Sequence, residues 1–105
     1  MIVTFEEEYL RSLYEKGRCS DKKHRYQPQI IATYQKRINT LQSVESPEKL
    51  YQFHSLHFEA LKGDKEGRFS VRVNLKYRIE FTLTCHEDET VIVICNIMEL
   101  SNHYD

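Results

Sequence analysis

Two runs of alternating apolar and polar residues in the second half of the chain predict a β-hairpin. From residue 68 to residue 74 every second side chain is apolar, and the same alternation returns between residues 77 and 83. A period of two is typical of strands that bury one face and expose the other. The segment between the runs, Asn74-Leu75-Lys76, has the length of a short hairpin loop. The expected apolar face consists of Phe69, Val71, Val73, Tyr77, Ile79, Phe81 and Leu83.

The register of this hairpin sets two arginines opposite each other. If both apolar sets cover one core, Val73 pairs with Tyr77, because a slip of one residue would turn an apolar set outward. In that register Arg72 lies opposite Arg78. Like charges at opposed sheet positions are destabilising, whereas two neighbouring guanidinium groups suit the binding of an anion. The pattern favours a phosphate site on the polar face, and an ordinary solvated sheet face is the alternative that it leaves open.

The other patterns along the chain predict an α+β fold. Apolar residues spaced by three and four predict two helices, at residues 6–16 and from Pro28 onward. We expect an N-terminal strand and these two helices to pack on one face of a mainly antiparallel sheet, leaving the Arg72/Arg78 face open, in a single domain over residues 1–105. A short helix is expected at residues 46–53, and further strands at residues 1–5, 57–61 and 90–98, the last apolar enough to be central.

Charge and cysteine content narrow the possible functions. The formal net charge is −1, so any binding to a polyanion must come from a local patch. Three cysteines without CxxC spacing indicate free thiols in a reducing compartment. His54 and His57 have metal-ligand spacing, but no Cys or acid cluster completes a site, and we expect neither metal nor cofactor. The absence of a signal-peptide pattern and of a long apolar stretch predicts a cytoplasmic protein outside the membrane.

Groups suited to acid–base chemistry accompany the arginine pair. Glu59 precedes the cationic segment and is a candidate general base, although taken alone it has the pattern of a surface glutamate. His103 is a candidate general acid, and Tyr104 a candidate for stacking on a base; a solvated tail is the alternative. The cations expected to bind phosphate or RNA beside Arg78 are Lys62, Lys65, Arg68 and Arg72.

In this order the motifs resemble the RelE/ParE superfamily of bacterial toxins, and within it the HigB-like group. The resemblance covers essentially the whole chain. It implies a RelE-like fold, ribosome-dependent cleavage of mRNA without a metal, and a HigA-like antitoxin partner with a helix-turn-helix domain. The motifs that carry it are Leu61-Lys62-Gly63-Asp64, Phe69-Ser70-Val71-Arg72-Val73-Asn74, Tyr77-Arg78-Ile79-Glu80-Phe81 and His103-Tyr104.

One position departs from the HigB-like pattern. HigB-like toxins commonly have His where this chain has Glu59, whereas YoeB-like toxins have Glu there and end in His-Tyr, as at His103 and Tyr104. The chain therefore resembles a HigB-like toxin with a YoeB-like set of catalytic groups. In that set Tyr104 orients the scissile nucleotide.

The resemblance also implies roles for the charged residues. Glu59 would take the proton from the 2′-OH, and His103 would protonate the leaving 5′-oxygen. Arg78, with Arg72 and Lys62, would stabilise the charge that develops on the phosphate. Two alternatives stay open: a ParE-like gyrase poison that cleaves nothing, and an inactive module that binds RNA or the antitoxin.

Overall fold

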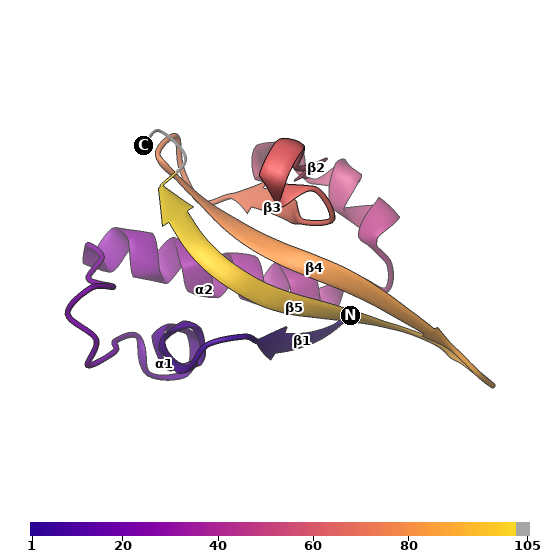
Figure 1. The fold of residues 1–105 in the computed structure, drawn as a ribbon, viewed down its shortest axis with the longest axis horizontal. Coiled ribbons are helices and arrows are strands. Elements are labelled where there is room, and N and C mark those ends of the chain that lie inside the picture. The colour runs from indigo at the N-terminus through magenta and orange to yellow at the C-terminus, as the bar shows by residue number, and fades with distance from the viewer. Residues whose placement is uncertain (103–105) are drawn as a thin grey trace.

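A mixed sheet of five strands organises the fold, which we describe from a computed structural model for residues 1–102. The strand order is β1-β5-β4-β3-β2, in which β1 runs parallel to β5 and the other neighbours are antiparallel (Figure 1). The elements are β1 (Ile2–Phe5), α1 (Glu8–Lys16), α2 (Pro28–Ser43), η1 (Pro47–Gln52), η2 (His54–Leu56), β2 (Glu59–Ala60), η3 (Gly63–Lys65), β3 (Phe69–Arg72), β4 (Tyr77–Glu87) and β5 (Val91–Asn102), where η marks a 3₁₀ helix. The predicted α+β class is confirmed.

Local sequence signals explain where the two α-helices begin and end. Gly17 has φ 70°, and its amide donates a hydrogen bond to the Leu13 carbonyl, which ends α1. Pro28 occupies the first turn of α2, where its missing N–H costs nothing. Both helices turn an apolar stripe to the sheet and are polar outside. The core between them and the sheet includes Leu10, Leu13, Tyr34, Ile38 and Leu41 against Val71, Ile79, Phe81 and Ile97.

The hairpin register predicted from the alternation is confirmed. Val71 pairs with Ile79 and Arg72 with Arg78, and the Val73 amide donates to the Tyr77 carbonyl. The alternation therefore turns Val71 and Ile79 into the core, and both arginines to the opposite face.

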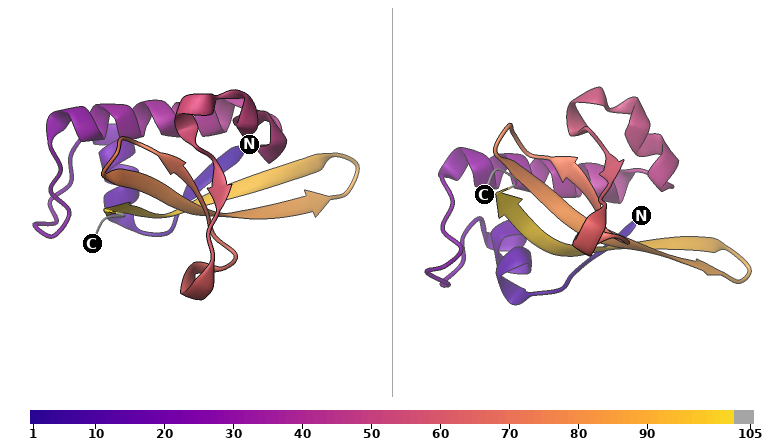
Figure 2. Two further views of the ribbon diagram at one scale, coloured as in Figure 1. Left: turned by 90° about the horizontal axis from the view of Figure 1, so that it is seen from above. Right: turned by 45° about the horizontal axis from the view of Figure 1, so that its top comes forward.

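That opposite face is less open than the pattern predicted. Figure 2 shows α2 and the η1–η2 segment on one side of the sheet and residues 63–65 on the other. The η3 turn folds over the polar face and brings Lys65 to within hydrogen-bonding distance of Glu80. The two α-helices leave this face uncovered, as expected, but η3 covers part of it.

Strands β4 and β5 are longer than the apolar runs suggested. The last strand was expected to end at residue 98, but β5 continues to Asn102. At its other end the β4–β5 pair projects past β1 and β3 as a two-stranded ribbon (Figures 1 and 2), with Val91 and Ile92 exposed. The helix predicted at residues 46–53 is a 3₁₀ helix followed by a second short one.

Candidate functional site

A shallow hollow on the polar face joins a carboxylate to the two opposed arginines. Its lining residues are His57, Glu59, Ser70, Arg72 and Arg78. Strand pairing explains the grouping, because Glu59 pairs with Ser70 on the neighbouring strand, and Arg72 with Arg78 on the next. The cavity measures about 20 Å³, which is room for about one water molecule. A ligand larger than water would have to lie on top of the hollow.

The Glu59 carboxylate and the Arg72 guanidinium group of this hollow form no ion pair with each other. Within residues 1–102 no Lys or Arg lies at ion-pair distance from the Glu59 carboxylate, and no acid lies at that distance from Arg72. The Arg72 backbone is held from the helix side, since Arg37 Nε of α2 donates to its carbonyl at 2.9 Å. Among the described residues, the hollow thus offers a carboxylate and a guanidinium group that form no ion pair, both on paired strands.

Glu80 gathers most of the neighbouring cations around a fully buried carboxylate. It accepts from Lys65 Nζ at 2.8 and 3.0 Å, from Arg68 Nη1 at 3.0 Å and from Arg78 Nε at 3.1 Å. The Ser101 hydroxyl donates a further bond of 2.8 Å. Burial alone would raise the pKa of Glu80, but the hydrogen bonds from Lys65, Ser101 and Arg68 outweigh it and lower the pKa to about 2. Glu80 is therefore an ionised internal counter-ion at neutral pH.

This network separates the predicted phosphate-binding residues into two groups. Lys65 and Arg68 surround Glu80 and do not line the hollow, and Arg68 also lies 3.6 Å from Glu99. Lys62 is exposed and likewise lies outside the hollow. Arg78 belongs to both groups, because its Nε is bound to Glu80 while the residue lines the hollow. Of the predicted cations, the structure brings only Arg72 and Arg78 together with Glu59.

The predicted general acid and stacking residue, His103 and Tyr104, lie outside the described residues. The strand that precedes them is described and ends next to the arginines. Ser101 pairs with Arg78, and Asn102 pairs with Tyr77.

His57 is a member of the hollow that the sequence pattern did not single out as one. It follows η2 with φ 46° and ψ 51°, the left-handed region that few non-glycine residues adopt. Within residues 1–102 it is the one non-glycine residue with positive φ. Such a conformation costs about 1–2 kcal/mol, and residues held in it cluster at functional sites. No periodicity predicts it, and the only signal in the sequence is a histidine two positions before the candidate base.

Comparison with known proteins identifies the family. A sequence model of the HigB-like toxins, described as the RelE-like toxin of the type II toxin-antitoxin system HigB, matches residues 3–97. The chain belongs to this family. A toxin of a type II system has an antitoxin partner. The match ends before His103 and Tyr104, so it gives no support for those two residues.

A solved structure shows the same fold. It is a "YoeB/ParE toxin from Agrobacterium tumefaciens", with a TM-score of 0.58 and 14% sequence identity, and the similarity covers 99% of this toxin and 100% of that chain. The comparison with curated proteins finds no match.

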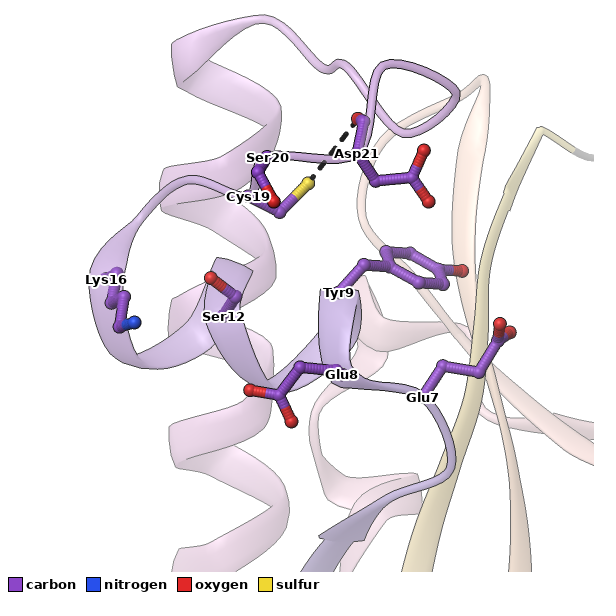
Figure 3. A pocket seen from close by; sticks show the side chains of 8 residues that line it. All are labelled: Glu7, Glu8, Tyr9, Ser12, Lys16, Cys19, Ser20 and Asp21. Atoms are coloured by element: carbon purple, nitrogen blue, oxygen red, sulfur yellow. Dashed lines mark hydrogen bonds between the residues drawn. The ribbon is translucent and has the colours of Figure 1, made fainter.

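A second hollow of the toxin has the wrong charge for nucleic acid. It lies on α1 and the loop after it, and Figure 3 shows the carboxylates of Glu7, Glu8 and Asp21 around it, with Lys16 at its far side. Cys19 Sγ is 3.8 Å from the Asp21 carbonyl oxygen. Three acids against one lysine repel phosphate, and the hollow shares no residue with the Arg72/Arg78 site.

Neither a metal site nor a membrane span stands out in the toxin. Residues 1–102 contain no group of three or more His, Cys, Asp or Glu side chains arranged to hold a metal ion. None of the helices in the same range has the length and hydropathy of a membrane span.

Proposed function

We propose that this toxin is an endoribonuclease that cleaves mRNA on the ribosome by general acid–base chemistry without a metal, in the cytoplasm. The observation that carries the proposal is the hollow in which Glu59, which forms no ion pair within residues 1–102, shares a surface with Arg72 and Arg78. Family membership supports it, because the RelE-like fold is common to the matched toxins.

The reaction needs only groups that the chain supplies. Glu59 removes the proton of the ribose 2′-OH, and the 2′-oxygen attacks the adjacent phosphorus, to which it is already tethered. Arg72 and Arg78 stabilise the extra negative charge of the phosphorane. The bond from phosphorus to the 5′-oxygen then breaks, leaving a 2′,3′-cyclic phosphate on one fragment. The departing 5′-oxygen takes a proton from His103.

The remaining predicted residues act on substrate position. Tyr104 orients the scissile nucleotide, and exposed Lys62 adds a contact to the RNA backbone. Lys65 and Arg68 contribute through Glu80, since their charged groups already point at its carboxylate. If the proton donor is His57, which lines the hollow, His57→Ala abolishes cleavage and His103→Ala leaves it intact.

The partner proposed for this toxin is a HigA-like antitoxin with a helix-turn-helix domain. Co-expression and purification of the pair should give one complex. Recovery of the toxin alone, from cells that contain the antitoxin, would contradict the pairing.

The test compares the wild type with Glu59→Gln during induced expression. The wild type should stop growth and create new mRNA 5′ ends within coding sequence, detected by primer extension. Glu59→Gln should lower cleavage by about 10²–10⁴-fold. Glu66→Gln is the matched control, because Glu66 is also exposed and the same charge is removed.

A gyrase poison is the second candidate, since the similar solved structure carries both the YoeB and the ParE name. Intact mRNA together with trapped gyrase–DNA complexes after induction would replace the nuclease with this function. Intact mRNA, free gyrase and retained antitoxin binding would instead identify an inactive binding module.

A further inference from the structure

We propose that an aromatic hollow beside the candidate cleavage site binds a nucleobase of the RNA, on a nucleotide adjacent to the phosphate held by Arg72 and Arg78. The proposal rests on the proposed function. The hollow has a cavity of about 310 Å³ and is lined by Leu50, Tyr51, Phe53, His54, His57 and Phe58.

The aromatic rings of this hollow are exposed to a degree that core packing does not require. Tyr51 is 63% exposed and Phe53 43% exposed. Single apolar residues on a surface are ordinary, but a cluster that lines a hollow indicates a binding site. No Lys or Arg is among the lining residues, so the hollow suits an uncharged flat group and not a phosphate.

The rings form a platform that is fixed before any ligand binds. Tyr51 meets Phe58 edge to face, with ring centroids 4.9 Å apart. Phe58 in turn stacks on Phe69 and Phe81, at 5.7 and 6.1 Å, and Phe81 is fully buried. The exposed ring is therefore held at the end of an aromatic chain anchored in the core. A preorganised ring loses little conformational entropy when a base stacks on it.

His57 connects this platform to the candidate cleavage site. It lines both hollows, the aromatic one and the one with Glu59 and Arg72. Its left-handed backbone turns the chain from η2 directly into β2, which carries Glu59. Because the two hollows share His57, an RNA strand with a phosphate over the arginines would bring a neighbouring nucleotide to the aromatic platform.

The two hollows suit different parts of a nucleotide, one the phosphate and the other the base. Guanidinium groups bind the phosphate, and aromatic faces stack on the base, which is the common mode for single-stranded RNA. Stacking accepts every base because every base has a π-face. The platform therefore adds affinity with weak sequence preference.

The experiment measures binding of a short labelled RNA whose 2′-OH groups are replaced by 2′-O-methyl, so that it cannot be cleaved. Tyr51→Ala should raise Kd roughly tenfold, within the range of one stacked base, while Tyr51→Phe should bind as the wild type does. Ile92→Ala is the control, because Ile92 is also an exposed apolar residue, 41% exposed, and does not line the aromatic hollow. Circular dichroism should confirm that all variants are folded.

An abasic series identifies the ligand as a base. Removing the base at one position of the RNA should raise Kd for the wild type by the same factor, and should add nothing in Tyr51→Ala. Equal losses in both proteins would overturn the proposal, as would unchanged binding by Tyr51→Ala. Weaker antitoxin binding with unchanged RNA binding would assign the surface to the antitoxin and would also overturn it.

Arg72→Ala separates this inference from the proposed function. It should weaken every RNA equally, with or without the base. If Arg72→Ala has no effect while Tyr51→Ala does, the phosphate site of the proposed function fails and the base platform stands.

Discussion

At the scale of single residues, Glu80 determines which cations remain available to a substrate. Its buried carboxylate accepts hydrogen bonds from Lys65, Arg68 and the Nε of Arg78. It also offsets the repulsion between the opposed arginines, because it lies on the same face two residues after Arg78. A buried carboxylate with several donors is stabilising only while it is charged and fully satisfied.

Acid should therefore destabilise the toxin through Glu80. The pKa of this carboxyl is about 2 in the folded chain, against 4.5 for an ordinary one. The stabilisation is fully present above about pH 5 and is lost as the pH falls from about 4.5 to 2, and it amounts to about 3 kcal/mol. Urea unfolding of the wild type and Glu80→Gln should show curves that differ near neutral pH and converge near pH 2. Glu66→Gln should follow the wild type, and a constant offset for Glu80→Gln at every pH would contradict this account.

The backbone of His57 gives a second prediction at this scale. Glycine adopts the left-handed region without strain, whereas alanine does not. His57→Gly should therefore be about 1 kcal/mol more stable than His57→Ala, measured as the free energy of unfolding. Both variants lack the imidazole and should bind RNA equally. If alanine is as stable as glycine here, the conformation carries no cost and the argument from strain fails.

At the scale of elements, apolar alternation was enough to predict the register of β3 and β4. A slip of one residue would turn Val71 or Ile79 outward, and with the short loop at residues 74–76 this favours the observed register, which sets Arg72 opposite Arg78. The cover over the polar face was not predictable in the same way. It depends on Gly63 and Gly67, whose φ values of 71° and 95° turn the chain back over the sheet.

The candidate site was predicted only as far as one sheet face determines it. Arg72, Arg78 and Glu59 share that face by strand parity and pairing. Lys65 and Arg68 are kept away from the hollow by their hydrogen bonds to Glu80. Contacts of this kind, made from a loop, produce no regular spacing of residues from which they could be predicted. The platform at Tyr51 was not predicted, because its residues lie in short 3₁₀ helices and the segments beside them, which have no apolar period.

The end of β5 at Asn102 determines which C-terminal truncations should leave the fold stable. Removing residues 103–105 should leave the free energy of unfolding nearly unchanged, because the core described above lies within residues 9–100. The same truncation should abolish mRNA cleavage if His103 is the acid. Cutting one position earlier, before Asn102, should also cost stability, since Asn102 pairs with Tyr77. Full activity of the 1–102 chain would move the proton donor to His57 or Lys62.

At the scale of the whole molecule, a net charge of −1 makes RNA binding depend on a few local cations. The affinity for single-stranded RNA falls with salt at a log–log slope of about −0.7 per neutralised phosphate. If Lys62, Arg72 and Arg78 alone contact a short RNA, the slope is about −2. Engagement of Lys65 and Arg68 as well would give about −3.5. Fluorescence anisotropy from low to high salt should give the smaller value for the wild type, and Glu80→Gln should move it toward the larger.

The parallel pairing of β1 with β5 has a consequence for how the chain is made. Ile2 of β1 pairs with Ile94 of β5. Strand β1 is synthesised first, but it can join the sheet only after β5 has been synthesised. Pairing between such distant segments is slow, because the long intervening loop must close first. Strand β4, which carries Arg78, also lacks its neighbour β5 until then. We therefore expect the complete sheet, and with it the support for the Arg72/Arg78 site, to form only after β5 has left the ribosome.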